Sequence, residues 1–194
     1  MSKENTEIFK KGFHSILTDV KTDKSIKTVL KRLDYLKINK KKYNLGDSDN
    51  AIIGKILNSY YKLINKHPLK IDDLILEDFE IVELEKISDL NLARYLIYRY
   101  KYNIYPKMHI VEDYPPCVQI EPSSICNFRC TMCFYVDESF SEKKNGYMGL
   151  MPIDIFKKSV DQIEGHVEAV TFASRGEPTA NKDLPDMLKY CEGK

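Results

Sequence analysis

The chain has 194 residues, of which 43% are hydrophobic and 30% are charged, and its formal net charge at pH 7 is +1. This composition is typical of a globular protein with one or two domains, and the balanced charge gives no reason to expect a nucleic-acid partner. No apolar run approaches the roughly 20 residues of a membrane span, and the N-terminus lacks the apolar core of a secretory signal. We therefore expect a cytoplasmic protein with no membrane partner.

Residues 1–112 predict an all-helical N-terminal domain. Apolar side chains recur at helical spacing in four segments, which are Phe9–Val20, Ile26–Leu36, about Asn50 to Asn65, and Asp89–Tyr105. Asp23 is expected to cap the second of these helices. The third is expected to end at His67, because the residue before a proline avoids the helical region.

Charge is distributed unevenly over this domain. The residues up to Tyr43 are rich in lysine, whereas Asp72–Glu85 is acidic. We interpret the two segments as solvated helix faces that attract each other. The alternative is that the lysines form a docking face for a polyanionic partner.

Residues 113–194 follow a different pattern and predict a second domain. Cys117–Glu121 alternates as a strand does, with Val118 and Ile120 on one face. Three further elements follow along the chain: a helix over Ile153–Glu164, a strand over Glu168–Ala173, and a helix over Leu184–Cys191. The order strand–helix–strand–helix indicates parallel strands.

Three cysteines lie within eight residues after the first strand. Cys126, Cys130 and Cys133 have the spacing C-x3-C-x2-C, and the chain has five cysteines in all, which favours a metal site over a disulfide framework. Three thiolates can hold three irons of a [4Fe–4S] cluster and leave the fourth iron open. One alternative is a zinc site that borrows His109 or Cys117 as fourth ligand. Another is that the thiols bind no metal.

A second motif, Gly176-Glu177-Pro178, follows the second predicted strand. Glycine allows a ligand to approach the backbone closely, and a glutamate can accept hydrogen bonds from a cationic amine. Taken alone, the triplet is an ordinary turn. Between the two motifs, the polar segment Asp137–Gly149 is predicted to be a mobile loop beside the site.

Together the two motifs resemble those of the radical S-adenosylmethionine (SAM) superfamily. The family signatures are C-x3-C-x-Φ-C after a first strand and Gly-Gly-Glu-Pro after a second. Met132 stands at the Φ position, and Arg175-Gly176-Glu177-Pro178 matches three of the four residues of the second signature. The resemblance covers residues 113–194 only.

The resemblance implies a chemistry and a set of site residues. Cys126, Cys130 and Cys133 would hold the [4Fe–4S] cluster, whose open iron would bind SAM. Reductive cleavage of SAM would then give a 5′-deoxyadenosyl radical that abstracts hydrogen from an unidentified substrate. Gly176 and Glu177 would hold the amino group of SAM, and the main chain at Met132 would border its adenine. No catalytic residue beyond the cluster ligands is assigned. Arg175 departs from the family pattern and is expected either to reach a carboxylate or to be solvated.

The resemblance also implies an α/β fold. We expect the first two βα units of a partial (βα)6 TIM-like barrel after the helical domain, with active residues at the carboxyl ends of the strands. Because four units are lacking, this segment alone is expected to be incomplete and inactive. A small electron donor of the flavodoxin or ferredoxin type is the expected partner. The alternatives are a non-catalytic iron–sulfur module for electron transfer or redox sensing, and a helical interaction protein.

Overall fold

A computed structural model describes residues 23–172 and 175–194 of the chain. The helix expected over Phe9–Val20 lies outside the described residues. The chain divides into two compact units, with the boundary between Ile110 and Val111. This boundary lies two residues before the one expected from the sequence, after residue 112.

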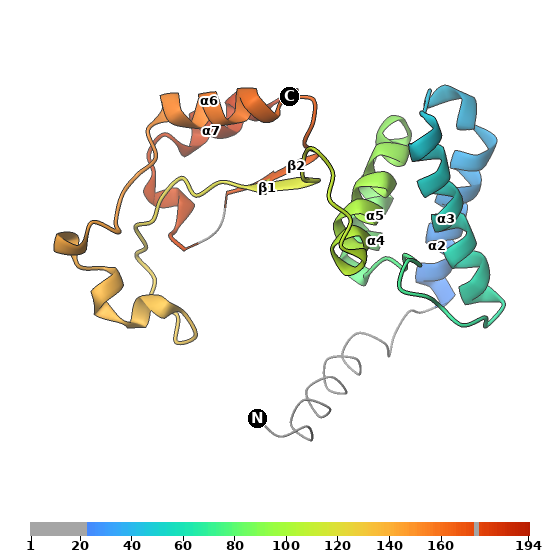
Figure 1. The fold of residues 1–194 in the computed structure, drawn as a ribbon, viewed down its shortest axis with the longest axis horizontal. Helices are drawn as coiled ribbons and strands as arrows, with labels where there is room; N and C mark the ends of the chain where they lie inside the picture. The colour runs from blue at the N-terminus through green and yellow to red at the C-terminus, as the bar shows by residue number, and fades with distance from the viewer. Residues whose placement is uncertain (1–22, 173–174) are drawn as a thin grey trace, which may run out of the picture. The chain divides into compact units, whose positions relative to one another are not determined.

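The first unit is helical (Figure 1). Its α-helices and two 3-10 turns are α2 (Asp23–Ile38), η1 (Lys40–Lys42), α3 (Asp47–Ile64), α4 (Asp78–Lys86), η2 (Asp89–Asn91) and α5 (Leu92–Met108). Helix α5 continues through Pro106 and ends three residues beyond the expected end at Tyr105. Pro106 has no N–H to donate to the carbonyl four residues before it, and the helix ends two residues later.

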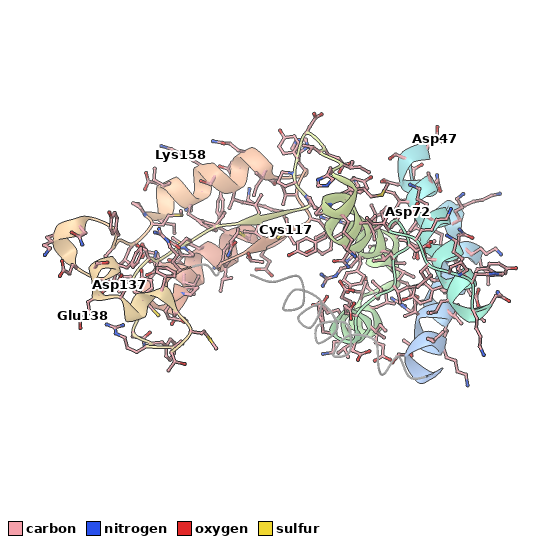
Figure 2. All side chains as sticks on the ribbon, turned by 60° about the horizontal axis from the view of Figure 1, so that its bottom comes forward. Asp47, Asp72, Cys117, Asp137, Glu138 and Lys158 are labelled. Atoms are coloured by element: carbon pink, nitrogen blue, oxygen red, sulfur yellow. The ribbon has the colours of Figure 1, made fainter. Side chains whose placement is uncertain are left out.

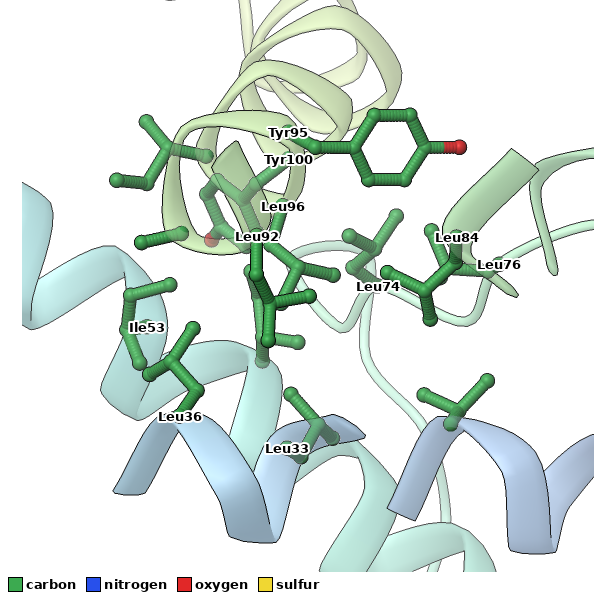
Figure 3. Packing of buried hydrophobic residues seen from close by; sticks show 14 of the residues in the cluster. Leu33, Leu36, Ile53, Leu74, Leu76, Leu84, Leu92, Tyr95, Leu96 and Tyr100 are labelled. Atoms are coloured by element: carbon green, nitrogen blue, oxygen red, sulfur yellow. The ribbon is translucent and has the colours of Figure 1, made fainter. Parts of the chain in front are cut away.

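Leucine, isoleucine and tyrosine side chains from the four described helices α2, α3, α4 and α5 form the core of this unit (Figure 3). Leu36 of α2, Leu84 of α4, and Leu92 and Leu96 of α5 are fully buried. The segment between α3 and α4 adds Leu74 and other apolar side chains to the same core. The amphipathic spacing seen in the sequence is therefore used to pack the helices against one another.

The basic and acidic segments of the unit are in contact. Helix α2 packs against α4, and Thr28 donates a hydrogen bond of 3.2 Å to Glu85. Arg32 forms an ion pair with Asp89 at 2.5 Å. Asp89 lies beyond the acidic segment Asp72–Glu85, and the lysines of η1 are exposed to solvent, so their positive charge is solvated.

The second unit contains a small parallel sheet with two helices. Its main elements are β1 (Cys117–Gln119), α6 (Ile153–Ile163), β2 (Ala169–Thr171) and α7 (Leu184–Cys191). The strands are parallel, with Val118 opposite Val170. Figure 1 shows both helices on the same side of the two strands. The core on that side is formed mainly by Ile120, Phe156, Val160 and Met187.

The expectation of a TIM-like barrel is wrong. The described residues are mostly helical, and they contain two strands of three residues each in one two-stranded sheet. No barrel of six βα units is evident in them, because closing a barrel requires many more paired strands than two. What the described residues do contain is a helical unit and, after it in the chain, a single β–α–β–α unit.

Candidate cofactor-binding site

Both sequence motifs follow strands of the small sheet. Because β1 and β2 are parallel, their carboxyl ends lie at the same edge, where ligands commonly bind in open α/β sheets. The cysteine segment follows β1, and the Gly-Glu-Pro motif follows β2. Figure 2 shows Cys117 where the chain enters β1, at the opposite end of the strand.

A backbone hydrogen bond joins the two motifs. The amide of Glu177 donates to the carbonyl of Ile125, the residue before Cys126, over 2.9 Å. The neighbouring Gly176 lies directly against the backbone of Ser123. A Cβ added to this glycine would lie 1.9 Å from the carbonyl oxygen of Ser123. Glycine is therefore required here by close packing of two backbones.

Arg175 is paired with a carboxylate and not simply solvated. Its guanidinium contacts Glu121 through Nη2 at 2.8 Å and Nε at 3.1 Å, and its backbone amide donates to the same carboxylate at 2.9 Å. The hydrogen bond and charge of Glu121 raise the pKa of Arg175 above its ordinary value. This pairing connects the residue that precedes Gly176 to the last residue of the predicted first strand.

The Glu177 carboxylate is held by its own turn. Its Oε1 accepts hydrogen bonds from the Thr179 hydroxyl at 2.6 Å and from the Thr179 amide at 3.1 Å. These hydrogen bonds lower the pKa of Glu177. The side chain is therefore anionic at neutral pH, as an acceptor for a cationic amine must be.

The three cysteines of the motif are free, but their thiols are not assembled into a ligand group. Cys130 is exposed, while Cys126 and Cys133 are half-buried. Within residues 23–172 and 175–194, no group of three or more His, Cys, Asp or Glu side chains is placed to hold a metal ion. This finding applies to the predicted cluster and to the zinc alternative alike.

The donor set nevertheless fits an iron–sulfur cluster by its chemistry. Cys126, Cys130 and Cys133 are free thiols on a segment with neither helix nor strand, so local backbone rotations can redirect them. The backbones of two of them are already joined by a turn, in which the amide of Cys133 donates to the carbonyl of Cys130 over 2.9 Å. The side chain of Met132 is 91% exposed, and no contact of the described structure bears on the role expected for its main chain.

The cysteine segment belongs to a loop that is closed at its base. The amide of Ser124 donates to the carbonyl of Gly149 at 3.0 Å, and the amide of Gly149 donates to the Ser124 hydroxyl at 2.8 Å. Ser123 and Leu150 form an antiparallel bridge next to these contacts. This closure could not be predicted from the sequence, because a pair of hydrogen bonds across twenty-odd residues leaves no periodic pattern.

An aromatic cluster lies inside the loop. Tyr135 is 4% exposed, and its hydroxyl donates to the carbonyl of Ser124. Burial raises the pKa of Tyr135. The ring of Phe134 lies 4.9 Å from that of Tyr135 and 5.0 Å from that of Phe140. The side chain of Tyr135 therefore ties the middle of the loop to its base.

The segment Asp137–Gly149, expected to be a mobile loop, contains two short 3-10 turns. These are η4 (Glu138–Phe140) and η5 (Lys143–Asn145), and Asp137 accepts a hydrogen bond from the amide of Ser139 at the start of η4 (Figure 2). An open pocket of about 510 Å³ lies between this part of the loop and the cysteine segment. It is lined by Arg129, Thr131, Tyr135, Glu138, Ser141 and Glu142.

A buried asparagine holds three parts of the site together. Asn181 is 2% exposed, and its amide group donates to the carbonyls of Pro122 at 2.8 Å and Met151 at 3.0 Å. Its side-chain oxygen accepts from the amide of Asp183 at 3.0 Å. The exit from β1, the end of the loop and the start of α7 are thus connected by one side chain, which sequence reasoning missed.

No protein-family model, curated protein or solved structure matches this chain. Over the described residues, none of the helices combines the length and the apolar character that crossing a membrane requires. The two motifs and the contacts between their segments are therefore the features that indicate a function for this chain.

Proposed function

We propose that this chain binds a [4Fe–4S] cluster and SAM as part of a radical SAM enzyme. The observation that carries the proposal is the 2.9 Å hydrogen bond from the amide of Glu177 to the carbonyl of Ile125. Two motifs that the resemblance assigns to one cofactor site lie far apart in the sequence, and Glu177 of the second is bonded to the residue directly before the first.

The proposed roles follow from the chemistry of each group. Cys126, Cys130 and Cys133 are the iron ligands, as thiolates. The carboxylate of Glu177 accepts a hydrogen bond from the ammonium group of SAM, and Gly176, which packs against the backbone of Ser123, helps to hold the same amino group. When bound, the cluster and SAM supply the one-electron chemistry that removes hydrogen from a substrate. The main chain of Met132 borders the adenine in this proposal.

Binding of the cluster is proposed to be coupled to a rearrangement of the cysteine segment. The three thiols do not form a ligand group in the described structure. Binding sites for metals are often completed only when the metal arrives, and the binding energy then orders the ligands. The base of the loop, held by Ser124, Gly149 and Asn181, can stay in place while the segment between Cys126 and Cys133 closes.

The proposal includes a partner and a compartment. Reduction of the cluster requires a small electron donor, for which a flavodoxin or a ferredoxin is suitable. Free thiols are kept reduced in the cytoplasm, where such donors occur. The substrate is not specified by any contact described above.

Anaerobic reconstitution with iron and sulfide tests this function. We expect about four irons per chain, as one [4Fe–4S] cluster requires. Adding SAM to the reduced protein should change the electron paramagnetic resonance (EPR) signal of the cluster. Iron without a response to SAM would instead favour an electron carrier or redox sensor. A stable zinc complex with a complete tetrahedral shell, or the absence of iron, would overturn the proposal.

A further inference from the structure

We propose that Arg175 and Glu121 form a positioning clamp that sets the place of the Gly-Glu-Pro motif relative to the cysteine segment. This inference rests on the proposed function and deepens it, because it adds two positioning residues to the SAM site. Neither residue is assigned to touch SAM or iron. Their role is to hold the backbone that does.

The clamp is made of three hydrogen bonds to one carboxylate. The guanidinium of Arg175 donates from Nη2 to Glu121 Oε1 at 2.8 Å and from Nε to Oε2 at 3.1 Å. The backbone amide of Arg175 donates to Oε2 at 2.9 Å. A two-pronged arginine–carboxylate pair fixes orientation as well as distance, which a single lysine contact does not.

The clamp is the first of three successive contacts between the same two segments. Arg175 binds Glu121, Gly176 packs against the backbone of Ser123, and the amide of Glu177 donates to Ile125. From one contact to the next, the segment after β2 advances by one residue and the segment after β1 advances by two. The position of Glu177 is therefore determined by contacts that begin at Arg175.

The clamp gives a physical reason for an arginine where the family pattern has glycine. The second contact, at Gly176, tolerates no Cβ, so it supplies close packing but no directional bond. The side chain of Arg175 supplies the direction, and it also neutralises Glu121 beside the site. With Glu121 paired to Arg175, the carboxylate of Glu177 in the same motif is not engaged by that arginine. Arg175 is itself committed to Glu121 and does not serve as a carboxylate receptor.

The first part of the test needs no cofactor. In the full chain without metal, we expect Arg175→Ala to make hydrogen exchange of the Glu177 amide about fivefold faster, because a half-exposed ion pair contributes modestly. The double variant Glu121→Arg with Arg175→Glu should restore part of the protection. Lys194→Ala is the matched control, because it removes ion pairs with Asp161 and Glu164 in the same unit but away from the motif. It should leave the Glu177 amide unchanged.

The second part uses the reconstituted protein. Arg175→Ala should bind as much iron as the wild type, while the SAM concentration needed for half of the EPR change rises about fivefold. The charge-swapped double variant should bring this concentration back toward the wild-type value, which a loss of general stability would not do. Lys194→Ala should bind SAM as the wild type does.

The outcomes separate the clamp from the function on which it rests. Wild-type protein that binds no iron, or shows no response to SAM, overturns the proposed function before any variant is compared. A wild type that responds to SAM, together with an Arg175→Ala variant of unchanged SAM dependence, overturns the clamp alone. Unchanged exchange of the Glu177 amide in Arg175→Ala also overturns it.

Discussion

The backbone amide of Glu177 donates a hydrogen bond to the carbonyl of Ile125 across 2.9 Å. One residue belongs to the segment after β2, and the other lies directly before the first cysteine of the segment after β1. The parallel pairing of the two strands brings their carboxyl ends to one edge, and this hydrogen bond extends the association beyond the sheet. Contact between the two motifs is therefore a property of the fold without any cofactor.

Gly176→Ala tests the packing that accompanies this hydrogen bond. The new Cβ would lie 1.9 Å from the carbonyl oxygen of Ser123, which is backbone and cannot rotate away. We expect the free energy of unfolding of this unit to fall by about 2 kcal/mol, as for other overpacked sites. Calorimetry and hydrogen exchange of the Glu177 amide measure the effect.

Gly149→Ala is the matched control for this change. It adds the same methyl group at the base of the same loop, where no atom lies within 4 Å of the new Cβ. We expect little change in stability. Equal losses of unfolding free energy in the two variants would mean that the close approach of Gly176 to Ser123 does not stabilise this edge of the sheet.

Individual cysteine substitutions test the ligand set. Serine in place of Cys126, Cys130 or Cys133 should lower the iron content after reconstitution to near background, because three ligands are the minimum for a cluster with one open iron. Cys117→Ser and Cys191→Ser are matched controls from the same unit and should keep full iron content. Burial raises the pKa of the Cys191 thiol, which makes it a poor ligand. Loss of iron in Cys117→Ser would instead indicate the alternative site that borrows this cysteine.

Helix positions in the second unit were largely predictable from the sequence. The expected helix over Leu184–Cys191 coincides with α7, and the expected helix over Ile153–Glu164 is one residue longer than α6. Both are amphipathic, and their apolar positions recur with the period of a helix. The two strands were also expected near their observed places, but each observed strand is shorter than the segment predicted for it.

The number of strands that pair in the sheet was not predictable in the same way, and the expected barrel was therefore wrong. A strand of three residues carries a local pattern but no information about how many other strands pair with it. The proximity of the two motifs follows from parallel strand order, and so it could be anticipated. The hydrogen bonds of Asn181 and of Ser124 join segments distant in sequence through single side chains, and no periodicity marks them.

Asn181→Ala tests how far one side chain organises the site. It removes a buried hydrogen bond to the carbonyl of Pro122, which keeps a second donor in the Met151 amide, and a partly buried one to the carbonyl of Met151. We expect a loss of about 1 kcal/mol in the free energy of unfolding, because the partly buried carbonyl of Met151 loses this donor. Thermal unfolding followed by calorimetry measures it.

The control for this variant is Asn145→Ala, which removes one exposed hydrogen bond, to the carbonyl of Ser139, within the loop. Its effect on stability should be much smaller. If the free energy of unfolding falls equally little in both variants, the connection between β1, the loop and α7 does not depend on Asn181.

The partly buried ion pair between Lys62 and Asp73 in the helical unit predicts a pH dependence. Asp73 accepts hydrogen bonds from Lys62 at 2.8 Å, from the amide of Lys70 at 2.6 Å and from Ser59 at 3.1 Å. Burial alone would raise the pKa of Asp73, but these donors outweigh it and hold the pKa below the ordinary value of 3.8. Asp73→Asn should therefore lower the free energy of unfolding by about 2 kcal/mol at neutral pH.

Because the folded chain lowers the pKa of Asp73, its stabilising effect is complete above pH 3.8 and disappears as the pH falls through the lower value in the folded chain. The difference in unfolding free energy between the wild type and Asp73→Asn should shrink over that acidic range. Far-UV circular dichroism in urea measures it, since the chain has no tryptophan. Asp72→Asn is the control, because the contact of Asp72 with Tyr100 is made by its backbone carbonyl. A difference that persists unchanged at acidic pH would show that Asp73 stabilises the unit by its shape and not by its charge.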